Sequence, residues 1–187
     1  MDAPPGLARR HRPFLAPVWL AALIPLLVAV VGLALLRTAT TTTVVIVRNA
    51  ESVLGSIADP PLIADGERRA ARLAYMLAGV PGSVGRITAI YVASGRRTQQ
   101  TVAPLASLLN LPPIIVPDTE LGSLAQRILS AHRGQSVLIV GYAATVAPLV
   151  RALTGMTLAP VREDDYGAVY VISVPPLGSA GILRLRY

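Results

Sequence analysis

Two arginines follow apolar runs of the sequence and are the side chains best suited to chemistry. Arg48 closes the β-branched run "TVVIVR" at residues 43–48, and Arg97 comes shortly after the run "ITAIYVA" at residues 87–93. A guanidinium group donates paired hydrogen bonds whose geometry matches the oxygens of a phosphate. If the fold brings them together, Arg48 and Arg97 are candidate anion-binding residues.

Predicted strands that alternate with predicted helices position Arg48 and Arg97. Apolar runs predict strands at 44–47, 87–93, 112–117, 136–141, 168–174 and 181–187, and amphipathic segments between most of them predict helices. This alternation predicts an α/β fold, a three-layer sandwich with a mostly parallel sheet. Ligands of such sheets bind where the strands end, so Arg48, the turn 94–97 and Tyr142 should converge.

An uncharged apolar segment precedes this domain. Residues 14–36 read "FLAPVWLAALIPLLVAVVGLALL", and about 20 such residues cross a bilayer as a helix. Arginines at positions 9, 10 and 12 place the N-terminus in the cytoplasm. We expect a cytoplasmic tail at 1–13, a transmembrane helix at 14–36, a linker at 37–42 and an extracytoplasmic domain at 43–187. The alternative is a signal peptide cleaved near 32–34, although typical signal segments have shorter apolar cores.

Composition limits the classes of partner. The formal net charge is +7, but the arginines are scattered and aromatic residues make up 4%, which argues against nucleic-acid binding. A basic domain near anionic lipid is the simpler interpretation. Cysteine is absent from the sequence, so disulfides and thiolate metal sites are excluded. We expect no metal and no cofactor, and we interpret the run "REDD" at 162–165 as a solvated loop.

Five motifs, in order, carry a resemblance to a known family: "VRNAE", "DPPLIADGERRAARLAYML", "ASGRRTQQTVAPLA", "VLIVGYAATVAPLVRAL" and "EDDYGAVYVISV". In these motifs the chain resembles the histidine phosphatase superfamily, with its phosphoglycerate mutase-like fold. The resemblance implies that Arg48 and Arg97 hold a phosphoryl group. It puts Asn49 in the place of the nucleophilic histidine and Tyr142 in that of the second pocket histidine. Glu120 falls near the acid that protonates the leaving group.

The residues at positions 49 and 142 affect which reaction the expected site could catalyse. An amide nitrogen has no available lone pair, so Asn49 cannot attack phosphorus as an imidazole does. The sequence has two histidines, and neither is placed to replace the missing ones. His11 lies on the cytoplasmic side of the expected membrane span. His132 precedes the strand 136–141, at the end of the sheet away from the expected site. Ser94 has no histidine base beside it in the sequence. We therefore expect a pseudoenzyme of the superfamily, without catalytic residues.

The resulting hypothesis is a single-pass protein of a bacterial cytoplasmic membrane whose C-terminal domain lies outside the cytoplasm. Its expected partners are the bilayer, through residues 14–36, and membrane proteins of a larger respiratory, transport or envelope complex. One alternative is a sensor that binds phosphate or another anion through Arg48 and Arg97. A second is that these arginines only pair with Glu51 or Glu120 as structural ion pairs. An active phosphatase is the least favoured alternative.

Overall fold

The computed structural model describes residues 18–53, 55, 58–79 and 85–187. The chain divides into two units, Met1–Leu36 and Arg37–Tyr187, and each is considered by itself. Helix α1 (Val18–Thr40) is followed after one residue by strand β1 (Thr42–Arg48). Helical backbone thus occupies most of the predicted linker 37–42. The predicted tail 1–13 and the first residues of the predicted span 14–36 lie outside the described residues.

A six-stranded sheet forms the centre of the domain, in the order β3-β2-β4-β1-β5-β6. Besides β1, its strands are β2 (Ile87–Ala93), β3 (Ile114–Val116), β4 (Ser136–Gly141), β5 (Ala168–Val174) and β6 (Gly181–Arg186). β1, β2, β3 and β4 are parallel to one another. β1 and β4 are buried along their whole length apart from one half-buried position in β1, as strands covered on both faces must be.

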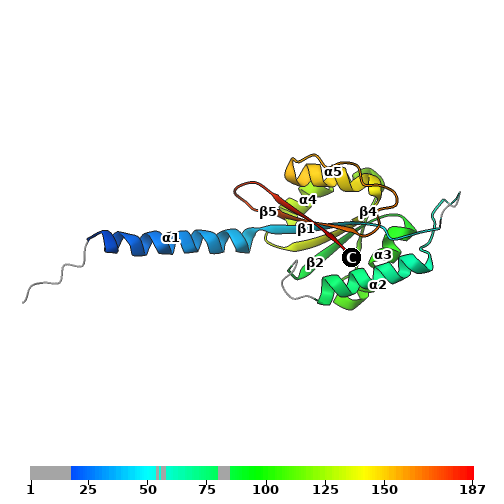
Figure 1. Cartoon of the computed structure of the whole chain (residues 1–187), viewed down its shortest axis with the longest axis horizontal. Helices are drawn as coiled ribbons and strands as arrows, with labels where there is room; N and C mark the ends of the chain where they lie inside the picture. The colour runs from blue at the N-terminus through cyan, green and yellow to red at the C-terminus, as the bar shows by residue number, and fades with distance from the viewer. Residues whose placement is uncertain (1–17, 54, 56–57, 80–84) are drawn as a thin grey trace, which may run out of the picture. The chain divides into compact units, whose positions relative to one another are not determined.

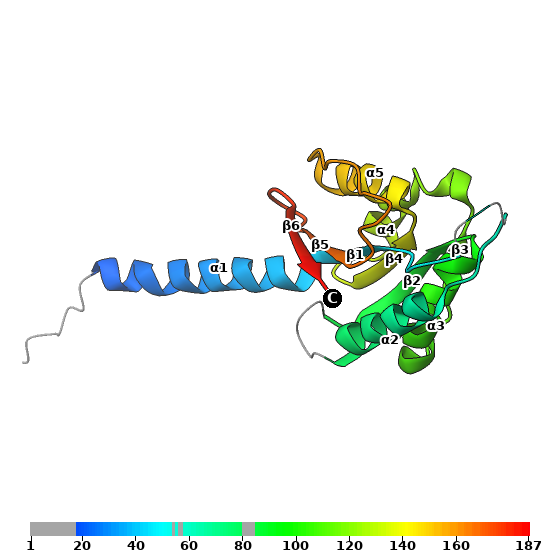
Figure 2. The same cartoon turned by 45° about the vertical axis from the view of Figure 1, so that its right-hand side comes forward.

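Helices cover both faces of the sheet (Figures 1 and 2). On one face α2 (Ala64–Gly79) and α3 (Arg96–Leu109) bury Leu73, Leu77 and Leu105 against alternate residues of the strands. On the other face α4 (Leu124–Ala131) and α5 (Ala143–Thr154) bury Ile128 and Leu149. A short 3₁₀ helix, η1 (Asp118–Glu120), follows β3. The three-layer α/β sandwich predicted from the sequence is confirmed.

The prediction of a mostly parallel sheet is wrong, because the sheet is mixed. β5 runs antiparallel to β1, and β6 runs antiparallel to β5. The cause is the connection after α5. Segment 155–167 returns without a helix to the end of the sheet where β1 finishes, so β5 starts there and Val169 pairs with Val47. β5 and β6 then form a hairpin, since no helix separates them.

In the part of the chain that the structure describes, no helix combines the length and the hydropathy that a membrane crossing requires.

Candidate functional site

Three adjacent parallel strands end side by side at what we call the carboxyl end of the sheet. In the register of the sheet, Arg48 of β1 lies beside Gly141 of β4, and Val92 of β2 lies beside Val140. The backbone N–H of Asn49 extends this pairing by donating to the Gly141 carbonyl at 2.8 Å. The segments that follow the three strands therefore meet, and they line two cavities.

The first cavity has a volume of about 310 Å³ and brings Arg48, Asn49 and Arg97 together. Arg48 is only 4% exposed. Its Nη1 donates to the Arg162 carbonyl at 2.9 Å, and its Nη2 lies 3.3 Å from a carboxylate oxygen of Glu163. Its guanidinium group stacks on the Tyr166 ring, 4.1 Å from the ring centre. The Nε of Arg48 is buried and has no hydrogen-bond partner among the described residues, so the hydrogen bonds of this cation are incomplete.

Arg97 enters the same cavity from the first turn of α3. It is half-buried, and no described carboxylate forms an ion pair with it. Its guanidinium group lies 4.9 Å from the centre of the Tyr142 ring. The two predicted anion-binding arginines thus line one cavity, in which their charges are only partly neutralised by Glu163.

Asn49 and Tyr142 are both held by hydrogen bonds. The Asn49 side chain is buried and donates from Nδ2 to the Ala50 carbonyl at 2.8 Å, which leaves its amide oxygen as an acceptor. The Tyr142 hydroxyl accepts the Gly95 N–H at 3.0 Å. Burial, the largest cause, and the charge of Asp118 raise the pKa of Tyr142, so its phenol stays neutral at physiological pH.

The second cavity, of about 560 Å³, shares Arg97 and Glu163 with the first. Its wall also carries Asp59, Ser94 and Asp118, and the Ser94 hydroxyl donates to Asp118 at 3.0 Å. The combined site therefore has a cationic half that suits a phosphoryl group. Its other half carries carboxyl and hydroxyl groups that suit the rest of a phosphoester.

The structure places Glu120 outside both cavities. Its carboxylate accepts a hydrogen bond from Arg127 at 2.8 Å, and both side chains are about half exposed. Asp118, at the other end of the same 3₁₀ helix, lines the second cavity instead. Glu163 and Tyr166 are two further site residues that were not predicted from the sequence. The run "EDDY" at 163–166 opens the fifth motif of the resemblance and overlaps the expected solvated loop 162–165, but no periodic pattern marks its approach to Arg48.

Arg48 forms an ion pair, but with a different carboxylate than the sequence suggested. Glu163, and neither Glu51 nor Glu120, is its partner. Glu51 binds Arg69, with nitrogen–oxygen distances of 2.5–2.8 Å, and so fixes the segment after β1 to α2. Burial by itself would raise the pKa of Glu51, but the hydrogen bonds and charge of Arg69 hold it below its ordinary value.

His132 lies at the opposite end of the sheet, which we call the amino end. Its backbone carbonyl accepts the hydroxyl of Thr42, the first residue of β1. Its ring is hydrogen-bonded to the Tyr91 hydroxyl and to the side chain of Gln135, each at 2.9 Å. His132 is therefore remote from the cavities, as the sequence predicted.

Comparison with known proteins shows which known structures share this fold. Residues 33–120 match the model of the histidine phosphatase superfamily (branch 1). The protein histidine phosphatase SixA, solved in complex with tungstate, has a TM-score of 0.62 and 22% identity over 77% of this chain and 96% of its own. A mycobacterial glucosyl-3-phosphoglycerate phosphatase has a TM-score of 0.57 and 14% identity, over 79% and 98% of the two chains.

A third structure, phosphoserine phosphatase of Entamoeba histolytica with 3-phosphoglyceric acid, has a TM-score of 0.55 and 12% identity over 75% and 96% of the two chains. A search among curated proteins gave no match. The solved structures show that the domain has the phosphoglycerate mutase-like fold, and the family model that matches residues 33–120 agrees with it.

These findings correct one expectation. Asn49 and Tyr142, in place of two histidines, led us to expect that the protein is not an enzyme. The solved structures that share its fold are phosphatases, and this finding overturns that conclusion. The amide of Asn49 argues only against one step, nucleophilic attack by an imidazole, and leaves other routes of phosphoryl transfer open.

Proposed function

We propose that this domain of the histidine phosphatase superfamily is a phosphatase-type domain that binds the phosphoryl group of a phosphoester between Arg48 and Arg97. The observation that carries the proposal is their shared cavity, in which Arg48 is nearly buried and its Nε has no hydrogen-bond partner among the described residues. A buried cation with an unused donor is stabilised by an anion that accepts from it.

Hydrolysis at this site proceeds by direct transfer to water. The water oxygen bonds to phosphorus as the bond to the leaving oxygen breaks. One proton of the water ends on the leaving oxygen, and the other stays on the phosphate that is released. Such transition states are loose, so positioning and charge stabilisation supply most of the catalysis. The two arginines stabilise the phosphoryl oxygens, and the amide oxygen of Asn49, at the wall of the cavity, accepts a hydrogen bond from the water. Asp118 lines the leaving-group side.

Binding and turnover are tested separately on the full-length protein in mild detergent. Calorimetry with phosphate and with tungstate, a phosphate mimic, measures binding. Phosphate release from p-nitrophenyl phosphate and from a panel of phosphoesters measures turnover. Arg97→Ala should abolish binding and any turnover. Arg96→Ala is the matched control, because Arg96 is the neighbouring exposed residue of α3 and lines neither cavity.

Binding with turnover that Arg97→Ala removes supports the whole proposal. Binding without turnover on any ester supports recognition alone and refutes the direct-hydrolysis step. If neither phosphate nor tungstate binds at millimolar concentration, the arginine pair is structural and the proposal fails.

The location of this function is a second part of the proposal: α1 attaches the domain to a bacterial cytoplasmic membrane, where it works within a larger protein complex. Support comes from the uncharged sequence of 14–36 and from large apolar side chains of α1 such as Ile24, Leu27 and Leu35, each more than 60% exposed. Such a surface is covered by lipid or by other helices.

Fractionation tests the attachment. Protein that stays with membranes after alkaline carbonate washing, and is released by detergent, supports it. Purification in mild detergent through a C-terminal tag, followed by mass spectrometry, then tests for partners. Release into the carbonate supernatant would refute attachment by α1, and recovery of the protein alone would argue against a stable complex.

A further inference from the structure

Charge is distributed unequally between the two ends of the sheet. Every carboxylate of residues 37–187 belongs to the carboxyl end. These residues follow β1 or β3, lie in or just before the first turn of α2, or belong to the segment that precedes β5: Glu51, Asp59, Asp65, Glu67, Asp118, Glu120, Glu163, Asp164 and Asp165.

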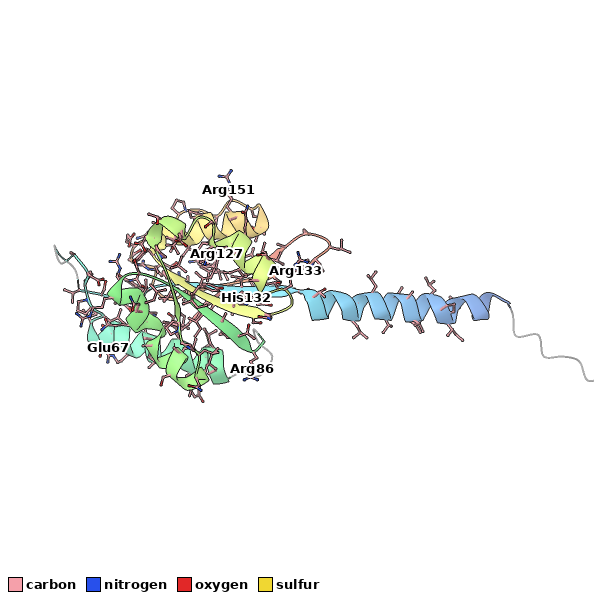
Figure 3. All side chains as sticks on the ribbon, turned by 180° about the vertical axis from the view of Figure 1, so that it is seen from behind. Glu67, Arg86, Arg127, His132, Arg133 and Arg151 are labelled. Carbon is pink, nitrogen blue, oxygen red and sulfur yellow. The ribbon has the colours of Figure 1, made fainter. Side chains whose placement is uncertain are left out.

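The amino end of the sheet carries cations instead. Arg86 immediately precedes β2, and Arg133 lies in the connection between α4 and β4. The two strands start beside each other, since Ile87 of β2 pairs with Ser136 of β4. Both arginines are exposed, and neither forms an ion pair with any described residue. Figure 3 shows Arg86, His132 and Arg133 at one end of the domain and Glu67 at the other.

An apolar tip accompanies these cations. β5 ends at Val174, which pairs with Thr42 at the start of β1, so the β5–β6 hairpin turns at the amino end. The turn carries Leu177, which is 64% exposed. Two exposed guanidinium groups and an exposed leucine, without a carboxylate, suit a surface that is anionic at its head groups and apolar beneath.

We propose that the amino end of the sheet, with Arg86, Arg133 and Leu177, docks on the surface of an anionic phospholipid bilayer. This contact turns the phosphate cavities away from the lipid, toward solvent. The chain path favours lipid as the occupant, because α1 ends at Thr40 and the chain enters the sheet at this end with Thr42. The inference rests on the proposed attachment by α1 and is independent of phosphate binding.

The absence of cysteine allows the docking to be measured with single labels. The full chain is reconstituted in nanodiscs of phosphatidylcholine, with or without phosphatidylglycerol. A fluorophore is placed on Gln135→Cys at the amino end or on Glu67→Cys at the carboxyl end, and a quencher is attached to the lipid head groups. We expect strong quenching at position 135 only with phosphatidylglycerol, and weak quenching at position 67 in both bilayers.

Neutralising the cations tests their role. Each arginine near an anionic surface shifts the ratio of docked to undocked domain about fivefold, so Arg86→Gln with Arg133→Gln should lower it about 25-fold. Arg151→Gln is the matched control, because Arg151 is an exposed arginine on α5 that Figure 3 shows away from Arg86 and Arg133.

Equal quenching at both positions, or quenching at position 135 that is the same with and without phosphatidylglycerol, would overturn docking. Failure of the full chain to enter nanodiscs would overturn attachment and docking together. None of these results would affect the calorimetric test of phosphate binding, so the two proposals fail separately.

Discussion

Removing the charge of Glu163 should strengthen phosphate binding. The Glu163 carboxylate lies 3.3 Å from Nη2 of Arg48 and lines both cavities, although the side chain is 84% exposed. It therefore occupies a donor that a phosphoryl oxygen would use, and it repels the incoming anion. Glu163→Gln keeps the size of the side chain and removes both effects.

The magnitude follows from charge and exposure. Two unit charges about 5 Å apart repel by about 0.8 kcal/mol at the dielectric of water and by about 3 kcal/mol at an effective dielectric of about 20. Because Glu163 is mostly exposed, the lower value applies, and a phosphate carrying more than one charge increases it to about 1–1.5 kcal/mol. We therefore expect binding about five- to tenfold tighter.

Calorimetric titration with phosphate at low salt measures this change. Glu120→Gln removes the same charge from a carboxylate that lines neither cavity, and it should leave affinity unchanged. The gain from Glu163→Gln should shrink as salt rises, since the Debye length falls from about 10 Å at 0.1 M to about 3 Å at 1 M. Unchanged or weaker binding in Glu163→Gln would mean that the carboxylate orients Arg48 rather than competing with the ligand, and our reading of the site would be wrong.

Three further predictions concern stability. Burial raises the pKa of Tyr187 to about 12, and its buried hydroxyl has no partner among the described residues. The folded state therefore loses stability as pH rises from about 10 through 12, and Tyr187→Phe should remove that loss without lowering the melting temperature. Arg69 lowers the pKa of Glu51 from 4.5, so the ion pair stabilises the fold at neutral pH and weakens as pH falls below about 4.5. Glu51→Gln should cost about 1 kcal/mol at pH 7 and flatten the acid side of the stability–pH curve measured by urea unfolding. Leu73→Ala, at a fully buried position of α2, should lower the free energy of unfolding by about 2–5 kcal/mol in the same assay.

Patterns within single elements were sufficient to predict most of the architecture. The unbroken apolar run at 136–141 predicts a strand covered on both faces, and β4 is such a strand. Because ligands of such sheets bind where the strands end, Arg48 and Arg97 were expected to lie together although they are 49 residues apart in the sequence. Strand direction after α5 could not be predicted this way. It depends on the path of segment 155–167, which has neither helical nor strand periodicity.

The same segment explains which site residues were missed. Glu163 and Tyr166 reach Arg48 across more than a hundred positions of sequence, through backbone that only the folded domain places. Within η1, spacing could not decide whether Asp118 or Glu120 faces the cavity, because the two lie in one 3₁₀ turn and their side chains diverge.

Arg48 and Arg97 differ in the number of protein groups that contact their guanidinium groups. This difference decides what an alanine variant of each residue can show about anion binding. Arg48 is nearly buried, with a carbonyl, a carboxylate and an aromatic ring already in contact, so its removal leaves those groups without their partner and costs stability. Arg97 is half-buried and contacts the Tyr142 ring without a carboxylate partner among the described residues, so it can move toward an anion at little cost to the fold. Loss of anion binding in Arg97→Ala is therefore evidence about the site, whereas the same loss in Arg48→Ala would also follow from a loosened segment 162–166.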